Sequence, residues 1–200
     1  MNTLQKAFLL RHTAGEKIKD IQADKDLTAP AKAKRIGEIR QKANDEVAKL
    51  RTARVKEASD ARDRVHRRLF GLSFKLGVSE NEKQAAMSSY RDALFRADGL
   101  ASPDDALRML GRAQMIGDKL LMKAIAAVAY ERGWSSVLED YSRSSEDVAD
   151  ALQELQNFER RQGNRHIQFN ESVVFSGITE TDEERALRML PASDDSPRAA

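Results

Sequence analysis

The chain has 200 residues, a formal net charge of +2, no cysteine and an aromatic content of only 6%. The absence of cysteine excludes disulfides and thiolate metal sites. No apolar run is long enough to span a membrane, and the first residues lack the apolar segment and cleavage site of a signal peptide. We therefore expect a cytoplasmic protein without membrane contacts.

Charge is distributed unevenly along the sequence. Residues 31–70 contain thirteen Lys or Arg and six Asp or Glu, whereas residues 171–200 contain three and seven. The sequence therefore has a basic arm and an acidic tail. These two segments either attract each other or attract different partners.

Residues 1–27 predict a first helix with a weak apolar pattern, which Gly15 interrupts. Thr28 is suited to cap the next helix, and Pro30 fits its first turn, where a missing N–H has no cost. We expect the first helix to fold back on the second, so that its apolar patch is covered.

Residues 31–76 predict one long charged helix, whose apolar stripe repeats every eleven residues. Eleven residues in three turns correspond to about 3.67 residues per turn, so the stripe stays on one side of a nearly straight helix. We interpret the stripe as the oligomerisation seam of a coiled coil, in which Arg54 sets the register and which Leu72 and Leu76 continue. The seam consists of Ile36, Ile39, Ala43, Val47, Leu50, Arg54, Ala58, Ala61, Val65 and Leu69.

Several arginines lie along one edge of this helix, beside the seam. They are candidates for contacts with nucleic-acid phosphates. Six acidic residues are interleaved with them, however, and a charged helix face is most often simply solvated. The candidate phosphate contacts are Arg40, Arg51, Arg62, Arg67 and Arg68.

Residues 78–163 predict a compact helical domain that holds the packed core. Ser79 begins a helix with a capping-box pattern, and this helix runs to Gly99, where we expect a left-handed C-terminal cap. Ser102 begins the next helix, with proline in the first turn.

Three more segments complete this domain. The apolar run over residues 107–128 is either one long helix or two helices with a break near Gly117. Residues 134–141 predict a short helix, and Ser145 begins a last helix that ends at Gly163.

The tail, residues 164–200, contains two further patterns. Residues 167–175 alternate partly and predict either a short β-hairpin or an extended segment that binds a partner. Residues 181–190 predict a capped amphipathic helix, which either docks in a partner's groove or packs on its own domain. The residues that would dock are Ala186, Leu187 and Leu190.

Chemical signatures are weak throughout the sequence. The three histidines, His12, His66 and His166, are too far apart in sequence to indicate a metal site. The stretch 111–119 resembles a phosphate loop only superficially, because its spacing is wrong and a helical stripe runs through it. Acid pairs such as the one at residues 104–105 are explained by helix capping. We therefore expect no enzyme, no catalytic residue, no cofactor and no metal.

The stretch LTAPAKAKRIGEIRQKANDEVAKLR, followed by charged helix and a small helical module, resembles the helical scaffolding and structural proteins of tailed bacteriophages. The resemblance covers chiefly residues 28–76. It implies an elongated coiled-coil protein of virion assembly, whose terminal helix touches the capsid subunit. The acidic C-terminal region departs from many scaffolds, in which that region is basic.

These observations predict an all-α fold. A hendecad-like coiled-coil arm (residues 1–77) precedes a small helical bundle (78–163) and a short tail (164–200), with a minor β-hairpin as one alternative. The function we expect is that of a phage scaffold or virion accessory protein, a homo-oligomer that binds other structural proteins such as capsid or portal. It would be cytoplasmic or incorporated into the virion. The alternatives are a nucleic-acid-associated protein that uses the basic arm, and a helical adaptor or inhibitor.

Overall fold

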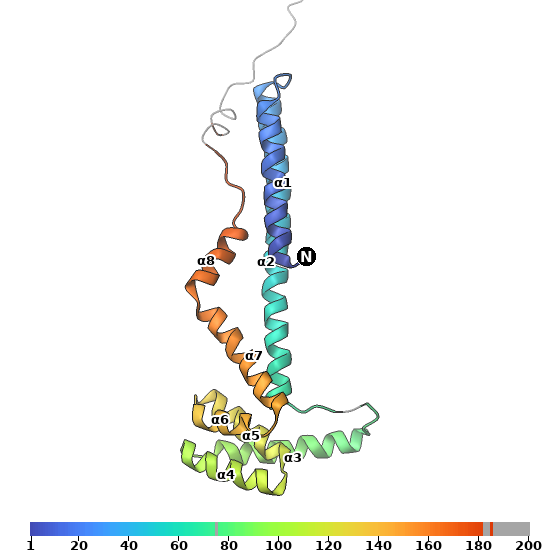
Figure 1. Ribbon diagram of the computed structural model, residues 1–200. Helices are drawn as coiled ribbons and strands as arrows, with labels where there is room; N and C mark the ends of the chain where they lie inside the picture. Colours follow the sequence, from blue (N-terminus) through green and yellow to red (C-terminus); the bar gives the residue numbers. More distant parts are fainter. Residues whose placement is uncertain (75, 182–184, 186–200) are drawn as a thin grey trace, which may run out of the picture. The chain divides into compact units, whose positions relative to one another are not determined.

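The computed structural model describes residues 1–74, 76–181 and 185, and over these residues the chain forms helices and no strand. The all-α class predicted from the sequence is confirmed. Figure 1 shows the helices in chain order. They are α1 (Thr3–Ala23), α2 (Ala29–Phe70), α3 (Glu80–Asp98), α4 (Pro103–Ile116), α5 (Lys119–Glu131), α6 (Ser135–Ser142), α7 (Glu146–Gly163) and α8 (Arg165–Val174).

The chain divides into two compact units. Unit 1 comprises Met1–Ala58 and Asn164–Ala200, and unit 2 comprises Ser59–Gly163. The α2 helix contributes residues to both units. The sequence predicts boundaries after residues 77 and 163. The first division in the structure lies earlier in the chain than residue 77, because it falls within α2.

In unit 1, α1 lies antiparallel along the first part of α2 (Figure 1). At one end Thr3 Oγ1 donates a hydrogen bond of 2.9 Å to the Glu57 carboxylate, and at the other end Lys32 Nζ donates one of 2.8 Å to the Gln22 carbonyl oxygen. Three of the six buried apolar positions are alanines, which let the two helices approach closely. The buried apolar residues of this α1–α2 pair are Ala7, Ala14, Ile18, Ile36, Ala43 and Val47.

The long helix ends earlier than predicted. It stops at Phe70, so Leu72 and Leu76 lie beyond it, and Leu76 is fully exposed. A Cβ atom on Gly71 would lie 2.7 Å from the carbonyl oxygen of Arg67, so the turn that follows the last helical residue favours glycine.

Unit 2 is built around α5, which packs against α3, α4 and α6. A helix that is apolar on most sides must be surrounded by others. The end of α2 joins this core through Val65, Leu69 and Phe70. The buried residues of α5 are Leu121, Ala124, Ile125, Ala126, Val128 and Ala129.

The helix starts in unit 2 follow their capping residues. Ser79 forms the predicted capping box with Glu82, and the Ser102 hydroxyl accepts a hydrogen bond from the Asp105 backbone N–H. The expected left-handed cap at Gly99 is wrong, since this residue has helical dihedral angles. Gly117, with φ of 71°, is left-handed and separates α4 from α5.

The expectation for residues 167–175 is corrected. They form neither a β-hairpin nor an extended segment but largely a helix, α8. The Asn164 side chain caps this helix by accepting hydrogen bonds from the backbone N–H groups of His166 and Ile167. The cap favours a helix, whereas the sequence alternation in this region is only partial. The predicted docking residues Ala186, Leu187 and Leu190 lie outside the described residues.

Candidate interaction groove on the α1–α2 pair

The predicted seam is largely covered by other parts of the same chain. In unit 1, Ile36 and Val47 are 1% and 2% exposed, and in unit 2 Val65 and Leu69 belong to the helical core. Pairing of the seam with a second copy stays a prediction, and it would require displacement of α1. The half-buried members are Ile39, Leu50, Arg54, Ala58 and Ala61.

A segment distant in sequence docks on the α1–α2 pair. We name residues 171–178, the end of α8 and the chain that follows it, the strap. Phe175 of the strap is 9% exposed and packs with Ala7 of α1 and Val47 of α2. The strap therefore completes the small apolar cluster of unit 1, and Leu4, Leu10, Leu50 and Val174 surround this cluster.

Two arginines hold the first part of the strap. The Arg54 guanidinium forms an ion pair of 3.2 Å with the Glu171 carboxylate, and Arg11 donates hydrogen bonds to the carbonyl oxygens of Val173 and Val174. Arg54 was predicted to set the register of an oligomer. In the structure this polar member of the seam pairs with the strap of its own chain.

An amide holds the end of the strap. The Asn44 side chain accepts a hydrogen bond of 2.7 Å from the Ile178 N–H, and its amide nitrogen lies 3.4 Å from the Ile178 carbonyl oxygen. A Cβ atom on Gly177 would lie 3.3 Å from Asn44 Oδ1, so glycine allows this close approach. Neither contact was predictable from the sequence, because Asn44 and Ile178 are far apart along the chain.

The α1–α2 pair also has a second, open groove. It is a cavity of about 250 Å³ with mainly apolar walls, and no residue of the strap lines it. Its apolar walls come from two residues of each helix, and longer polar side chains form the rim. The lining residues are Leu10, Thr13, Ala14, Lys17, Ile39, Lys42, Ala43 and Glu46.

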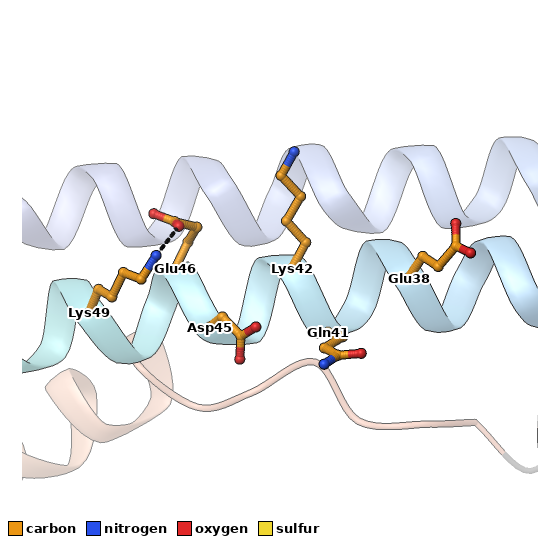
Figure 2. Close-up of a pocket in the computed structure, with 6 residues that line it drawn as sticks. All are labelled: Glu38, Gln41, Lys42, Asp45, Glu46 and Lys49. Carbon is orange, nitrogen blue, oxygen red and sulfur yellow. Dashed lines mark hydrogen bonds and ion pairs between the residues drawn. The ribbon is translucent and has the colours of Figure 1, made fainter.

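A row of charged and polar side chains lies along α2, and two of them, Lys42 and Glu46, also line the open groove. Figure 2 shows both acidic and basic groups along it, and the Glu46 carboxylate forms an ion pair of 2.7 Å with Lys49 Nζ. Opposite charges three or four residues apart support an exposed helix. We interpret this shallow depression as a solvated helix face. It is lined by Glu38, Gln41, Lys42, Asp45, Glu46 and Lys49.

The candidate phosphate contacts are divided between the two units. Arg40 and Arg51 belong to unit 1, and Arg62, Arg67 and Arg68 to unit 2. Arg62 is hydrogen-bonded to the Tyr130 hydroxyl, which raises the pKa of its guanidinium, and Arg68 lies 3.6 Å from the Glu154 carboxylate. Arg51 and Arg67 are exposed.

In unit 2, side chains of three helices cap the last turn of α2. The Tyr141 hydroxyl donates to the Leu69 carbonyl oxygen at 3.1 Å, and the Tyr90 hydroxyl donates to that of Phe70. Lys123 Nζ donates to the carbonyl oxygens of Arg68 and Gly71 at 3.1 and 2.7 Å. These carbonyl groups have no partner within the helix, and an ammonium group there complements the helix dipole.

Burial at this cap changes the acid–base properties of Tyr141 and Lys123. It raises the pKa of Tyr141 to about 12, with a smaller contribution from nearby Tyr90, and it lowers the pKa of Lys123. The cap was not evident from the sequence, since its donors come from α3, α5 and α6.

The raised pKa of Tyr141 predicts a loss of stability in alkali. The neutral phenol stabilises the folded state fully below about pH 10, and this contribution, on the order of 2 kcal/mol, is lost as the pH rises towards 12. We expect the free energy of unfolding of unit 2, followed by the fluorescence of Trp134, to fall over this range. Tyr141→Phe should show a shallower fall, and equal slopes for both proteins would contradict the assignment.

A larger cavity of about 520 Å³ lies in unit 2, among the ends of α4 to α7. It has basic groups at Lys119, Lys123 and Arg143, but Lys123 is engaged at the cap of α2 and Arg143 pairs with Glu139 at 3.1 Å. The groups that line it therefore serve the helix ends and the surface, and we assign no chemistry to them.

The residues considered for chemistry are dispersed. His66 packs against the rings of Phe70 and Tyr130, and His12 stacks on Phe8. Within the described residues, no group of three or more His, Cys, Asp or Glu side chains is arranged to hold a metal ion. None of the helices that the structure describes combines the length and apolar character needed to cross a bilayer.

Comparisons with protein-family models, with curated proteins and with solved structures found no match for this chain. The resemblance of residues 28–76 to phage scaffolding proteins therefore stays a prediction. The candidate site rests on the geometry of unit 1 alone.

Proposed function

We propose that this chain is a non-enzymatic structural or assembly protein that self-associates through unit 1. The observation that carries the proposal is the set of large apolar side chains that unit 1 leaves exposed. They come from all three of its helices, and α1 and α8 are in contact with each other. They include Phe8 (62% exposed), Leu9 (51%), Val55 (64%), Phe169 (66%) and Val173 (47%).

The composition of the unit 1 core explains why such side chains matter. The apolar cluster at the strap is small and consists of Ala7, Val47 and Phe175. Phe8, Leu9 and Phe169 of the same unit are each more than half exposed, and exposed apolar side chains that gather into one patch are typical of contact sites. The open apolar groove between α1 and α2 adds to this surface.

A more specific role forms part of the proposal. The resemblance of residues 28–76 to phage scaffolding proteins supports a scaffold or virion accessory protein, cytoplasmic or within the particle, with capsid or portal protein as a further partner. The exposed apolar residues favour contacts between proteins over binding of nucleic acid, because phosphate binding requires gathered cations, whereas Arg68 already faces an acidic side chain.

Sedimentation equilibrium of the intact chain at low and high salt tests the proposal. We expect a dimer or larger assembly at both salt concentrations, because apolar contacts are not screened by ions. The double variant Phe8→Ser/Leu9→Ser should shift the average mass towards the monomer. The matched control Phe95→Ser changes an 82% exposed side chain of unit 2 and should leave the mass unchanged. A monomer of the unchanged protein under both conditions would overturn the proposal.

A further inference from the structure

The strap is held by contacts that do not depend on whether it belongs to the same copy of the chain as the α1–α2 pair on which it docks. Glu171 meets Arg54, the Val173 carbonyl meets Arg11, and Ile178 meets Asn44. Each pair joins residues at least 117 positions apart in the sequence, and the whole of unit 2 lies between them. The strap of another copy would make the same contacts with the same atoms.

The strap is also attached lightly. No residue of α8 is buried, and within the strap only Phe175 is buried. The Arg54–Glu171 ion pair is about one third exposed on both sides, so solvent weakens it. Segments with few buried apolar contacts are the ones that open locally most often.

The surface of the α1–α2 pair on which the strap docks, which is distinct from the open groove described above, nevertheless requires an occupant. Without the strap, the apolar surfaces of Ala7 and Val47 lose the ring of Phe175, and Asn44 loses its backbone partner. If the strap opens, the identical segment of another copy therefore restores these contacts with the least loss of stability.

We propose that the strap of one copy docks on the α1–α2 pair of a second copy, in reciprocal exchange. This inference rests on the proposed self-association and adds a second contact to it, because Phe8 and Leu9 stay exposed when the strap is docked. Exchange satisfies both grooves of a two-fold dimer with contacts that the monomer already possesses, and it leaves no strap or groove empty. The partner is therefore a second copy of this chain, recognised through Glu171, Phe175, Gly177 and Ile178.

Disulfide trapping tests the exchange, because the chain has no cysteine of its own. A Cβ atom on Gly177 would lie 3.4 Å from the Asn44 Cγ atom, so cysteines at both positions fall within bonding reach. Asn44→Cys and Gly177→Cys are prepared as separate full-length proteins, mixed at equal concentration and oxidised. We expect a covalent heterodimer whose yield rises with protein concentration.

Two controls accompany the mixture. The double variant Asn44→Cys/Gly177→Cys reports whether the strap lies in the groove at all. A mixture of Gly177→Cys with Ala53→Cys, an exposed position on the same helix, measures random coupling and should give little heterodimer.

The outcomes separate the two proposals. A double variant that closes within one chain, together with a mixture that gives no more heterodimer than the Ala53 control, would overturn the exchange. If sedimentation of the unchanged protein still shows a dimer in that case, the self-association stands and uses another contact. A double variant that forms no disulfide would overturn the placement of the strap on which the exchange depends.

Discussion

Val47→Asp should detach α1 and the strap from α2 while unit 2 stays folded. Val47 is 2% exposed and is packed between Ala7 and Phe175, so a carboxylate there would be buried without a partner. A buried charge that has no partner typically costs about 3–5 kcal/mol of stability. Because the cluster around Val47 is small, this loss should be enough to release both segments.

Two signals report on this variant separately. Hydrogen exchange should show loss of protection over residues 3–23 and 171–178, with a decrease in helical circular dichroism. Trp134, the chain's only tryptophan, lies in unit 2, and its unfolding transition should stay unchanged. The control Ala53→Asp places a carboxylate on the same helix at an exposed position and should alter stability by less than about 0.5 kcal/mol. Similar exchange patterns in both variants would refute the proposed packing of unit 1.

Ile125→Ala should destabilise unit 2 by about 3 kcal/mol. Ile125 is fully buried at the centre of α5, where the helices around it are packed closely and have little freedom to close a cavity. The change is measured as a shift of the denaturant midpoint in the fluorescence of Trp134. We expect the slope of the transition to be unaltered.

The matched control for this prediction is Ile116→Ala. Ile116 is 76% exposed at the end of α4, so its truncation removes little buried area and should change the free energy of unfolding by less than about 0.5 kcal/mol. If both variants shifted the midpoint equally, α5 would not be the centre of the core.

Local signals predicted much of the architecture. Capping residues marked the starts of α3 and α4, and the eleven-residue repeat marked α2 as one long helix. Such features act within a few residues, so they can be read without knowing the fold. Two local interpretations were wrong: Gly99 has helical dihedral angles, and residues 167–175 form largely a helix that Asn164 caps.

The candidate site could be predicted only in part. The stripe on α2 indicated correctly that Ile36 and Val47 need a covering surface, but a stripe does not specify what covers it. The two docking contacts of the strap, Arg54–Glu171 and Asn44–Ile178, join segments separated by all of unit 2. No periodicity in the sequence indicates that two such distant segments are in contact.

The helical class, the length of α2 to within one or two turns at each end, and the face of α2 that must be buried all follow from hydrophobic period and capping. These are properties of neighbouring residues. The surfaces that cover this face, namely α1, the strap and the core of unit 2, depend on the fold, as do the contacts of Tyr90, Lys123 and Tyr141 that cap the end of α2. The physical reason is that burial is non-directional: an apolar stripe is stabilised by any complementary surface, and the surface that reaches it is set by the path of the whole chain.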